Sequence, residues 1–300
     1  VTTDDFQRSI ANLEFIASAI GKSGKHLVIE DFHYLSIPER HRMAHDLKTL
    51  WDYKCFVILI GVWTQTNLLT SLNPDLTGRM EEIPILWSHE DLQAVIEKGS
   101  AVLNISIDEE IKKTLIRDSF GNVGILQILL LKLIEDEAGI DETSNVLICV
   151  TQPEFLERAA KSYADQLDGR YQQFAKLLSA GIRKRKKATG IYAYAMEAIV
   201  SAPDEALIDG FSRDDIFEIT NSKPRIKKGN LKTVLGKLVE LQEPESGHEL
   251  VISYDESIDA IFVVDRQLLF YRKYHTMRWP WEAMVEEAEA LTLFELEEES

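Results

Sequence analysis

Two adjacent carboxylates, Glu30 and Asp31, follow a short apolar run formed by Leu27, Val28 and Ile29. The run predicts a strand buried on both faces of a parallel sheet. Acids at the carboxyl end of such a strand lie where α/β sheets bind ligands. Mg²⁺ prefers carboxylate and water oxygens together with substrate phosphates. We therefore expect Glu30 to hold the metal or its water and Asp31 to orient an attacking water. The alternative is a strand that ends in a solvated turn.

A second apolar run, residues 56–60, is separated from the first by a helical pattern over residues 38–52 with Pro38 near its first turn. Strand, helix and strand at this spacing predict a right-handed crossover in a parallel sheet. Gly61 and a group of polar residues follow the second run, so they are expected at the same edge as the two acids. The polar residues singled out are Thr64, Gln65 and Asn67.

These two runs resemble the AAA+ ATPase superfamily of P-loop NTPases, in particular its signal-transducing (STAND) and origin-recognition-like branches. The resemblance implies that the acid-tipped strand is the Walker B strand, with ATP and Mg²⁺ as cofactors. It also implies that Thr64 senses the γ-phosphate, with Gln65 and Asn67 as alternates. The family more often places Asp before Glu, or two Asp, so the order Glu30–Asp31 leaves the division of labour between them open.

The phosphate-binding loop of that family does not occur in the sequence. Gly21-Lys22-Ser23 lacks the glycine that the motif requires at position 16, which is Ile16. The tripeptide also precedes a strand, and we interpret it as a helix end with Gly21 at the C-cap. Because the chain starts at Val1 in mid-pattern, we expect a fragment whose complete protein hydrolyses ATP, and we expect this chain alone to be inactive.

Residues 81–87, Glu-Glu-Ile-Pro-Ile-Leu-Trp, predict a short strand after the Asn73–Pro74 break. The resemblance places an arginine that reaches a neighbouring subunit's nucleotide just before it, which corresponds to Arg79. The planar, permanently charged guanidinium suits a phosphate. The alternative is a surface ion pair of Arg79 with Glu81 or Glu82.

Three helical patterns between residues 88 and 140 resemble the lid of AAA+ proteins. Asn122 and Gly124 stand where the family has its second nucleotide sensor, which the resemblance makes cofactor-binding residues. Many members have an arginine there and this chain has none after Gly124, so either catalysis is weak or the nucleotide acts as a switch.

The region beyond a helical connector (141–190) resembles a winged helix-turn-helix over residues 191–275, with a hairpin around Asp255-Glu256-Ser257. Its third helix would enter the DNA major groove. A local excess of basic residues is what duplex phosphates require, although winged helices also bind proteins. The predicted DNA contacts are Lys223, Arg225, Lys227, Lys228, Lys232 and Lys237.

An acidic tail (276–300) carries eight Glu from Glu282 onward, and either shields the basic face or keeps the chain in solution. The net charge of −17 argues against binding of nucleic acid over the whole surface.

No apolar run is long enough to cross a membrane and no signal peptide is visible. Cys55 and Cys149 lie beside apolar runs and predict reduced core thiols in a cytoplasmic protein.

The predicted fold is therefore a partial α/β parallel sheet (1–87, the AAA+ nucleotide-binding core), then the helical lid, the connector, the winged helix and the tail. The first functional hypothesis is a nucleotide-gated assembly or DNA-acting switch, as in transposition, replication or anti-phage defence, working as a homo-oligomer or with a partner protein. The alternative is a winged-helix module that binds DNA or protein beside a catalytically inactive scaffold.

Overall fold

The computed structural model describes residues 12–32, 35–63, 68–183, 190–223, 226–242 and 250–298. The chain divides into two compact units, Val1–Pro84 and Ile85–Ser300. Each unit is described by itself below. Within the described residues, no helix is both long and apolar enough to span a bilayer.

The first unit is built on a parallel strand pair. Strand β1 (Leu27–Ile29) pairs in parallel with β2 (Val57–Leu59), and helix α3 (Ile37–Asp52) connects them. A capping box between Ser36 and Glu39 begins α3. This arrangement confirms the predicted strand–helix–strand crossover. Helix α2 (Leu13–Ser23) precedes β1 and ends at Gly24 in the left-handed conformation, so Gly21 lies inside the helix and not at its C-cap as expected.

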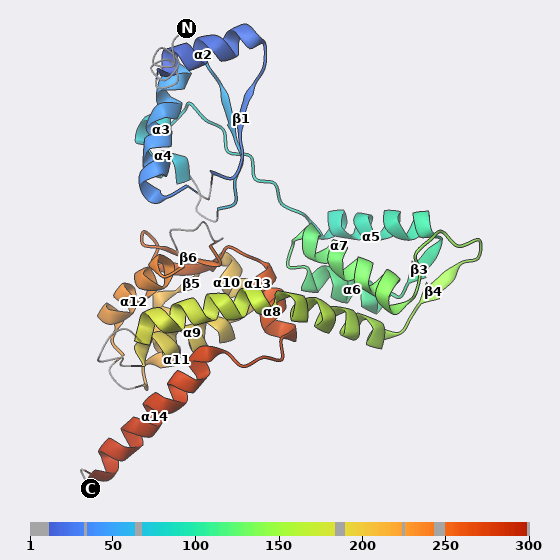
Figure 1. The fold of residues 1–300 in the computed structure, drawn as a ribbon, viewed down its shortest axis with the longest axis vertical. Helices are drawn as coiled ribbons and strands as arrows, with labels where there is room; N and C mark the ends of the chain where they lie inside the picture. The colour runs from blue at the N-terminus through green and yellow to red at the C-terminus, as the bar shows by residue number, and fades with distance from the viewer. Residues whose placement is uncertain are drawn as a thin grey trace. The chain divides into compact units, whose positions relative to one another are not determined.

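The helices of the first unit cover one face of the strand pair (Figure 1). Leu59 packs with Phe32, with α3, with α4 (Leu68–Leu72) and with η2 (Pro74–Leu76), while Val57 packs with α2. The opposite face is exposed. The prediction of strands buried on both faces is therefore wrong for the described residues. The exposed apolar side chains are Val28, Phe56, Ile58, Ile60 and Val62.

The strand predicted over residues 81–87 does not form. The segment has no regular secondary structure, and its apolar side chains face solvent, with Ile83 73% and Ile85 85% exposed. A strand requires a partner for its backbone N–H and C=O groups. The segment has the apolar composition of a strand, but the described residues contain no neighbouring strand for it.

The second unit begins with a helical bundle and a two-stranded parallel ribbon. Its helices are α5 (His89–Leu103), α6 (Glu109–Asp118) and α7 (Val123–Leu131), and α7 continues into a π-helical turn, η3 (Lys132–Glu137). Strand β3 (Ile105–Ile107) pairs with β4 (Ile148–Val150). Strand β4 lies in the segment predicted as a helical connector, so the connector is not helical throughout. The ribbon also exposes Cys149, so the core position predicted for that thiol is wrong, whereas Cys55 is buried.

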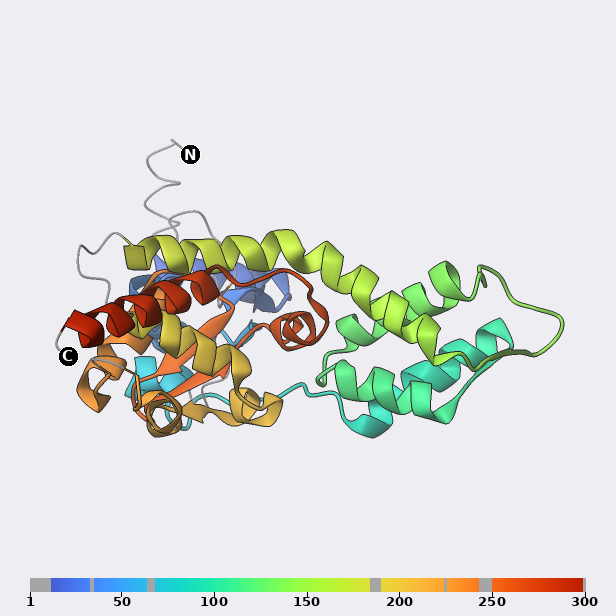
Figure 2. The same ribbon diagram turned by 90° about the horizontal axis from the view of Figure 1, so that it is seen from below.

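One long helix, α8 (Pro153–Arg183), runs from the bundle along the C-terminal helices (Figure 2). In the C-terminal module, α9, α11 and α12 precede a hairpin, as expected for three helices and a hairpin, whereas the helix α10 and the short strand β5 between α9 and α11 were not predicted. The strands of this module form an antiparallel sheet in the order β5–β7–β6. The elements are α9 (Ile191–Ser201), α10 (Asp204–Asp209), β5 (Phe211–Ser212), α11 (Arg213–Thr220), α12 (Lys228–Glu240), β6 (Ile252–Asp255), β7 (Ala260–Val263), α13 (Gln267–Tyr274) and α14 (Pro280–Glu298).

A buried amide fastens α12 to the hairpin. Gln242, 4% exposed, donates from Nε2 to the carbonyl oxygens of Leu238 (3.0 Å) and Ile252 (3.1 Å). Its Oε1 accepts from the backbone N–H groups of Val251 (3.1 Å) and Ile252 (2.9 Å). All the hydrogen-bonding capacity of the amide is used where water has little access, so this side chain fixes the start of β6.

We predict that Gln242→Ala lowers the free energy of unfolding of the second unit by about 2–4 kcal/mol, because buried backbone groups lose their partners. Urea denaturation followed by circular dichroism measures the change. Gln93→Ala is the matched control, since the Gln93 amide is exposed and bonds only to Glu97 in the described contacts, and it should change the value by less than about 0.5 kcal/mol. Equal effects of the two substitutions would contradict this role for Gln242.

Candidate functional site

The two predicted metal ligands lie on a bulge at the carboxyl end of β1. Ile60 donates from its N–H to Ile29 O (2.8 Å) and accepts from Phe32 N–H (3.2 Å). A regular parallel ladder leaves one residue between two such partners, whereas here both Glu30 and Asp31 lie between them. Asp31 adopts the left-handed conformation, with φ +58°. Asp tolerates this conformation better than most residues.

The bulge changes where the two acids point. Successive side chains of a regular strand alternate between faces, but Glu30 and Asp31 are both exposed, while Phe32 after them is fully buried. The extra residue thus presents two carboxylates to solvent at one place. Within the described parts of the chain, no group of three or more His, Cys, Asp or Glu side chains could hold a metal. The pair therefore suits Mg²⁺ only as a shared site, with phosphate or water supplying the other oxygens.

The residues after β2 lie beside the bulge. Trp63 contacts Phe32 edge to face, with ring centroids 6.0 Å apart, and its Nε1 donates to Glu82 (3.2 Å). A Cβ atom on Gly61 would lie 2.5 Å from the Trp63 ring and 3.4 Å from Phe32 Cβ. Glycine is therefore required for the indole to pack here. The three predicted sensor residues, Thr64, Gln65 and Asn67, lie outside the described residues, so their role stays a prediction.

Arg79 is held at the other end of the strand pair. Its guanidinium lies 3.8 Å from Asp52, the last residue of α3, which also pairs with Lys48 at 2.8 Å. The hydrogen bond from Lys48, helped by the charge of Arg79, keeps the pKa of Asp52 below its usual range. The expected alternative pair with Glu81 or Glu82 is not what the structure shows. Because a crossover helix ends near the amino end of the next strand, Arg79 does not converge with Glu30 and Asp31 of the same chain.

The two predicted second-sensor residues form a helix cap. Asn122 is the N-cap of α7, and its Oδ1 accepts from the N–H groups of Gly124 (2.8 Å) and Ile125 (3.3 Å). Capping accounts for Asn122, and Gly124 leaves room for the cap, since a Cβ atom there would lie 3.1 Å from Asn122 Oδ1. A contact of either residue with nucleotide stays a prediction.

The lysines predicted to bind DNA carry acidic partners. Lys223 pairs with Glu289 of α14 (2.6 Å), and Lys228 pairs with Asp214 (3.1 Å). Arg225 lies outside the described residues, and Lys227 is exposed at the N-cap of α12. The remaining pairs are Lys232 with Glu256 at 3.8 Å and Lys237 with Glu240.

The charge of the surrounding module is negative. Residues 191–275 contain fifteen acidic and ten basic residues, a net charge of −5. Three of these acids, Asp255, Glu256 and Asp259, lie in the hairpin next to α12. A basic hairpin would attract DNA phosphates, whereas this acidic one repels them. The contact of Lys223 with Glu289 also brings the acidic tail onto one of the predicted DNA ligands.

A buried polar cluster around Asp118 was not predicted from the sequence. Asp118, the last residue of α6, is 2% exposed. It accepts from Arg117 Nε (2.8 Å), from Lys273 Nζ (2.5 Å) and from the Tyr274 hydroxyl. Burial opposes ionisation, but the three donors outweigh it and hold the pKa of Asp118 below its usual range. The sequence does contain a signal for it. Asp118 lies at helical spacing from Ile111 and Leu115, so its carboxylate falls on the buried face of α6 and needs partners there.

Comparison of the sequence and the structure with known proteins identifies no relative of this chain. No family model matches the chain, and no curated protein or solved structure is detectably similar to it.

We predict that Gly61→Ala displaces the Trp63 ring and lowers the stability of the first unit by about 1–3 kcal/mol, as overpacking does. Hydrogen exchange of the β1 and β2 amides in a urea series measures the loss. Gly21→Ala is the control, because its Cβ would meet nothing within 4 Å in α2, and alanine in a helix interior is expected to add up to about 1 kcal/mol. Unchanged protection in Gly61→Ala would show that Trp63 does not need this glycine.

Proposed function

We propose that this chain is part of a nucleotide-gated switch of the AAA+ type, in which Glu30 and Asp31 act on Mg²⁺-bound ATP. The observation that carries the proposal is the bulge at the carboxyl end of β1. It presents both carboxylates beside the end of the parallel strand β2, where α/β sheets bind ligands. In this role one carboxylate binds the magnesium ion or its water, and the other orients the water that attacks the γ-phosphate.

The open side of the first unit supports a place in a larger sheet. Parallel strands normally have helices on both faces, yet Ile58 is 52% and Val62 54% exposed on the uncovered face. The apolar segment 81–87 also has no strand partner in the part of the chain that the structure describes. Both features are expected of a strand pair whose neighbouring strands and helices come from outside the described residues.

Arg79 supports an oligomeric form of the switch. Among the described residues, its buried NH1 nitrogen finds no hydrogen-bond partner, and its ion pair with Asp52 is long. Since it lies away from Glu30 and Asp31, a nucleotide that it contacts would belong to another subunit. The two free thiols, Cys55 and Cys149, support a cytoplasmic location.

In the full-length gene product, Glu30→Gln and Asp31→Asn are each expected to slow ATP hydrolysis by about 100-fold or more. The affinity for Mg²⁺-ATP should change much less, because phosphate contacts supply most of the binding. Phosphate release and a nucleotide-binding titration measure the two quantities.

Glu14→Gln and Asp75→Asn are the matched controls, because both carboxylates are exposed in the same unit away from the bulge. They should leave turnover unchanged. Wild-type turnover in Glu30→Gln and Asp31→Asn together, or a full-length protein that does not bind Mg²⁺-ATP, would remove the ATPase proposal.

The second candidate is a C-terminal binding module beside an inactive ATPase-like scaffold. The placement of Gly21-Lys22-Ser23 favours it, because this tripeptide ends α2 and precedes β1, whereas a phosphate-binding loop follows a strand and begins a helix. In this candidate the module binds double-stranded DNA or a protein through the surface of α12 and the hairpin. The acidic partners of its lysines favour a protein.

If the module binds DNA, Lys227→Glu with Lys228→Glu will weaken binding to duplex DNA. The slope of log affinity against log salt should then fall by about 2, because two phosphate contacts are lost. Lys98→Glu with Lys161→Glu makes the same charge change on exposed residues of α5 and α8 and serves as the control. If the two double variants show the same DNA affinity and the same salt slope, or if the wild type does not bind DNA, the result would favour a protein target.

A further inference from the structure

Within the described residues of 85–300, the α5–α7 bundle is linked to the C-terminal module in two ways, by a shared helix and by a polar cluster. The first is α8, 31 residues long, which extends roughly 46 Å. Its first turns contact η3 through two hydrogen bonds, from Lys132 Nζ to Ser162 Oγ (3.0 Å) and from Arg158 Nε to Glu137 (2.6 Å). A single shared helix ties two groups of elements together but leaves rotation about its axis to be fixed elsewhere.

The far half of α8 is fastened to α13. The Tyr171 hydroxyl donates to Asp265 (2.5 Å), the Tyr271 hydroxyl donates to Asp168 (2.6 Å), and the two tyrosine rings stack with centroids 4.7 Å apart. Burial raises the pKa of both hydroxyls, that of Tyr271 to about 12, so both remain donors at neutral pH. Helix α13 therefore moves with α8 and with the C-terminal module.

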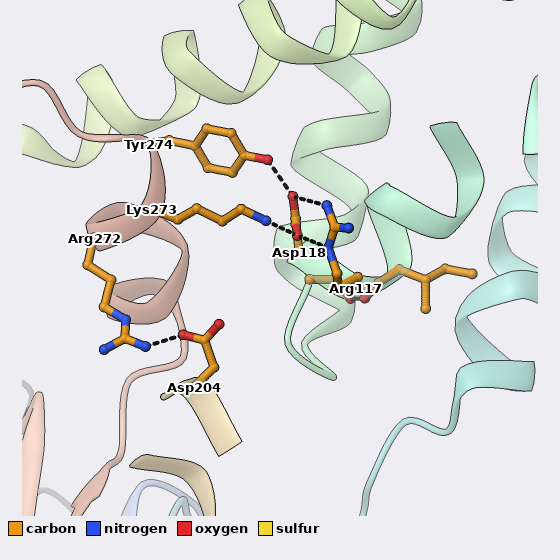
Figure 3. Close-up of polar contacts among 8 residues, drawn as sticks. Arg117, Asp118, Asp204, Arg272, Lys273 and Tyr274 are labelled. Atoms are coloured by element: carbon orange, nitrogen blue, oxygen red, sulfur yellow. Dashed lines mark hydrogen bonds and ion pairs between the residues drawn. The ribbon is translucent and has the colours of Figure 1, made fainter. Parts of the chain in front are cut away.

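The second connection is the Asp118 cluster, which spans from α6 to α13 (Figure 3). Three consecutive residues of α13 divide between the two sides. Arg272 donates to Val200 O (2.8 Å) and pairs with Asp204 inside the C-terminal module. Lys273 and Tyr274 donate to Asp118 of the bundle.

We propose that Asp118, Lys273 and Tyr274 form a releasable clasp that fixes the orientation of the α5–α7 bundle against the C-terminal module about α8. The clasp rests on contacts within residues 85–300 and does not depend on the nucleotide chemistry proposed above.

The exposure of the partners explains why the clasp can open. Asp118 is 2% exposed, but Lys273 is 37% and Arg117 64% exposed. On opening, Lys273, which is already partly hydrated, gains the rest of its hydration and the Asp118 carboxylate regains its own, while Arg117 stays beside Asp118 on α6. A buried ion pair contributes little net stability for this reason, while it specifies one geometry. A partner or ligand with a small preference for either orientation would then shift the population.

The test is a distance measurement between spin labels on the two sides, in a Cys149→Ser background that removes the exposed native thiol. Labels go to Val102→Cys in α5 and Ile219→Cys in α11, which are 69% and 54% exposed. We expect one narrow distance distribution in the parent protein. Asp118→Asn and Lys273→Met should each give a distribution about twofold broader, because the bundle then samples several orientations.

Lys161→Met is the matched control, as this lysine is exposed on α8 outside the clasp. A second label pair within the C-terminal module, Ile219→Cys with Ile258→Cys, must keep its distribution in every variant that remains folded. If Asp118→Asn changes the distribution of that second label pair, the test uses Tyr274→Phe in its place, because this substitution removes one hydrogen-bond donor and no charge. Distributions for Val102 and Ile219 that match the parent in Lys273→Met and Tyr274→Phe would overturn the clasp.

Discussion

The parallel pairing of β1 with β2 is the constraint on which the functional account depends. Because α3 returns the chain to the start of a parallel neighbour, the residues after both strands lie at one edge of the sheet. The bonds of Ile60 to Ile29 and Phe32 then place the extra residue of the bulge at that edge. Without this pairing, Glu30 and Asp31 would be two acids in a turn.

Periodicity predicted the elements well where the pattern alone decides them. The crossover and the hairpin of β6 and β7 lie where their apolar spacing and turn residues place them. The strand over 81–87 failed for a different reason. An apolar run states a preference for burial, but a strand also needs a partner chain. The prediction that β1 is buried on both faces was wrong for the same reason, because the described residues provide nothing to cover the face that includes Val28.

The candidate site was predicted in its residues but not in its geometry. The two acids were visible after β1, whereas the bulge depends on which atoms Ile60 meets, and this register cannot be read from one strand alone. The partners of Arg79 and Lys228 came from residues distant in sequence, Asp52 and Asp214. The family resemblance assigned Arg79 to a phosphate and the local excess of basic residues assigned Lys228, but tertiary contacts supply carboxylates to both.

The buried polar groups of the second unit show how orientation is specified where apolar packing is permissive. Gln242 fixes one strand against one helix through four hydrogen bonds, and Asp118 joins elements more than 150 residues apart in sequence. Each side chain requires its partners at defined positions because an unpaired buried polar group is costly. Such contacts select one arrangement among several with similar apolar burial.

Paramagnetic broadening by Mn²⁺ in the presence of ATP tests the central claim most directly, since Mn²⁺ replaces Mg²⁺ at oxygen sites. In amide spectra of the full-length protein, the account predicts the strongest broadening at Glu30, Asp31 and Phe32 and next at Ile60 and Gly61. Broadening centred on the acidic helix α14, or none that requires ATP, would contradict it.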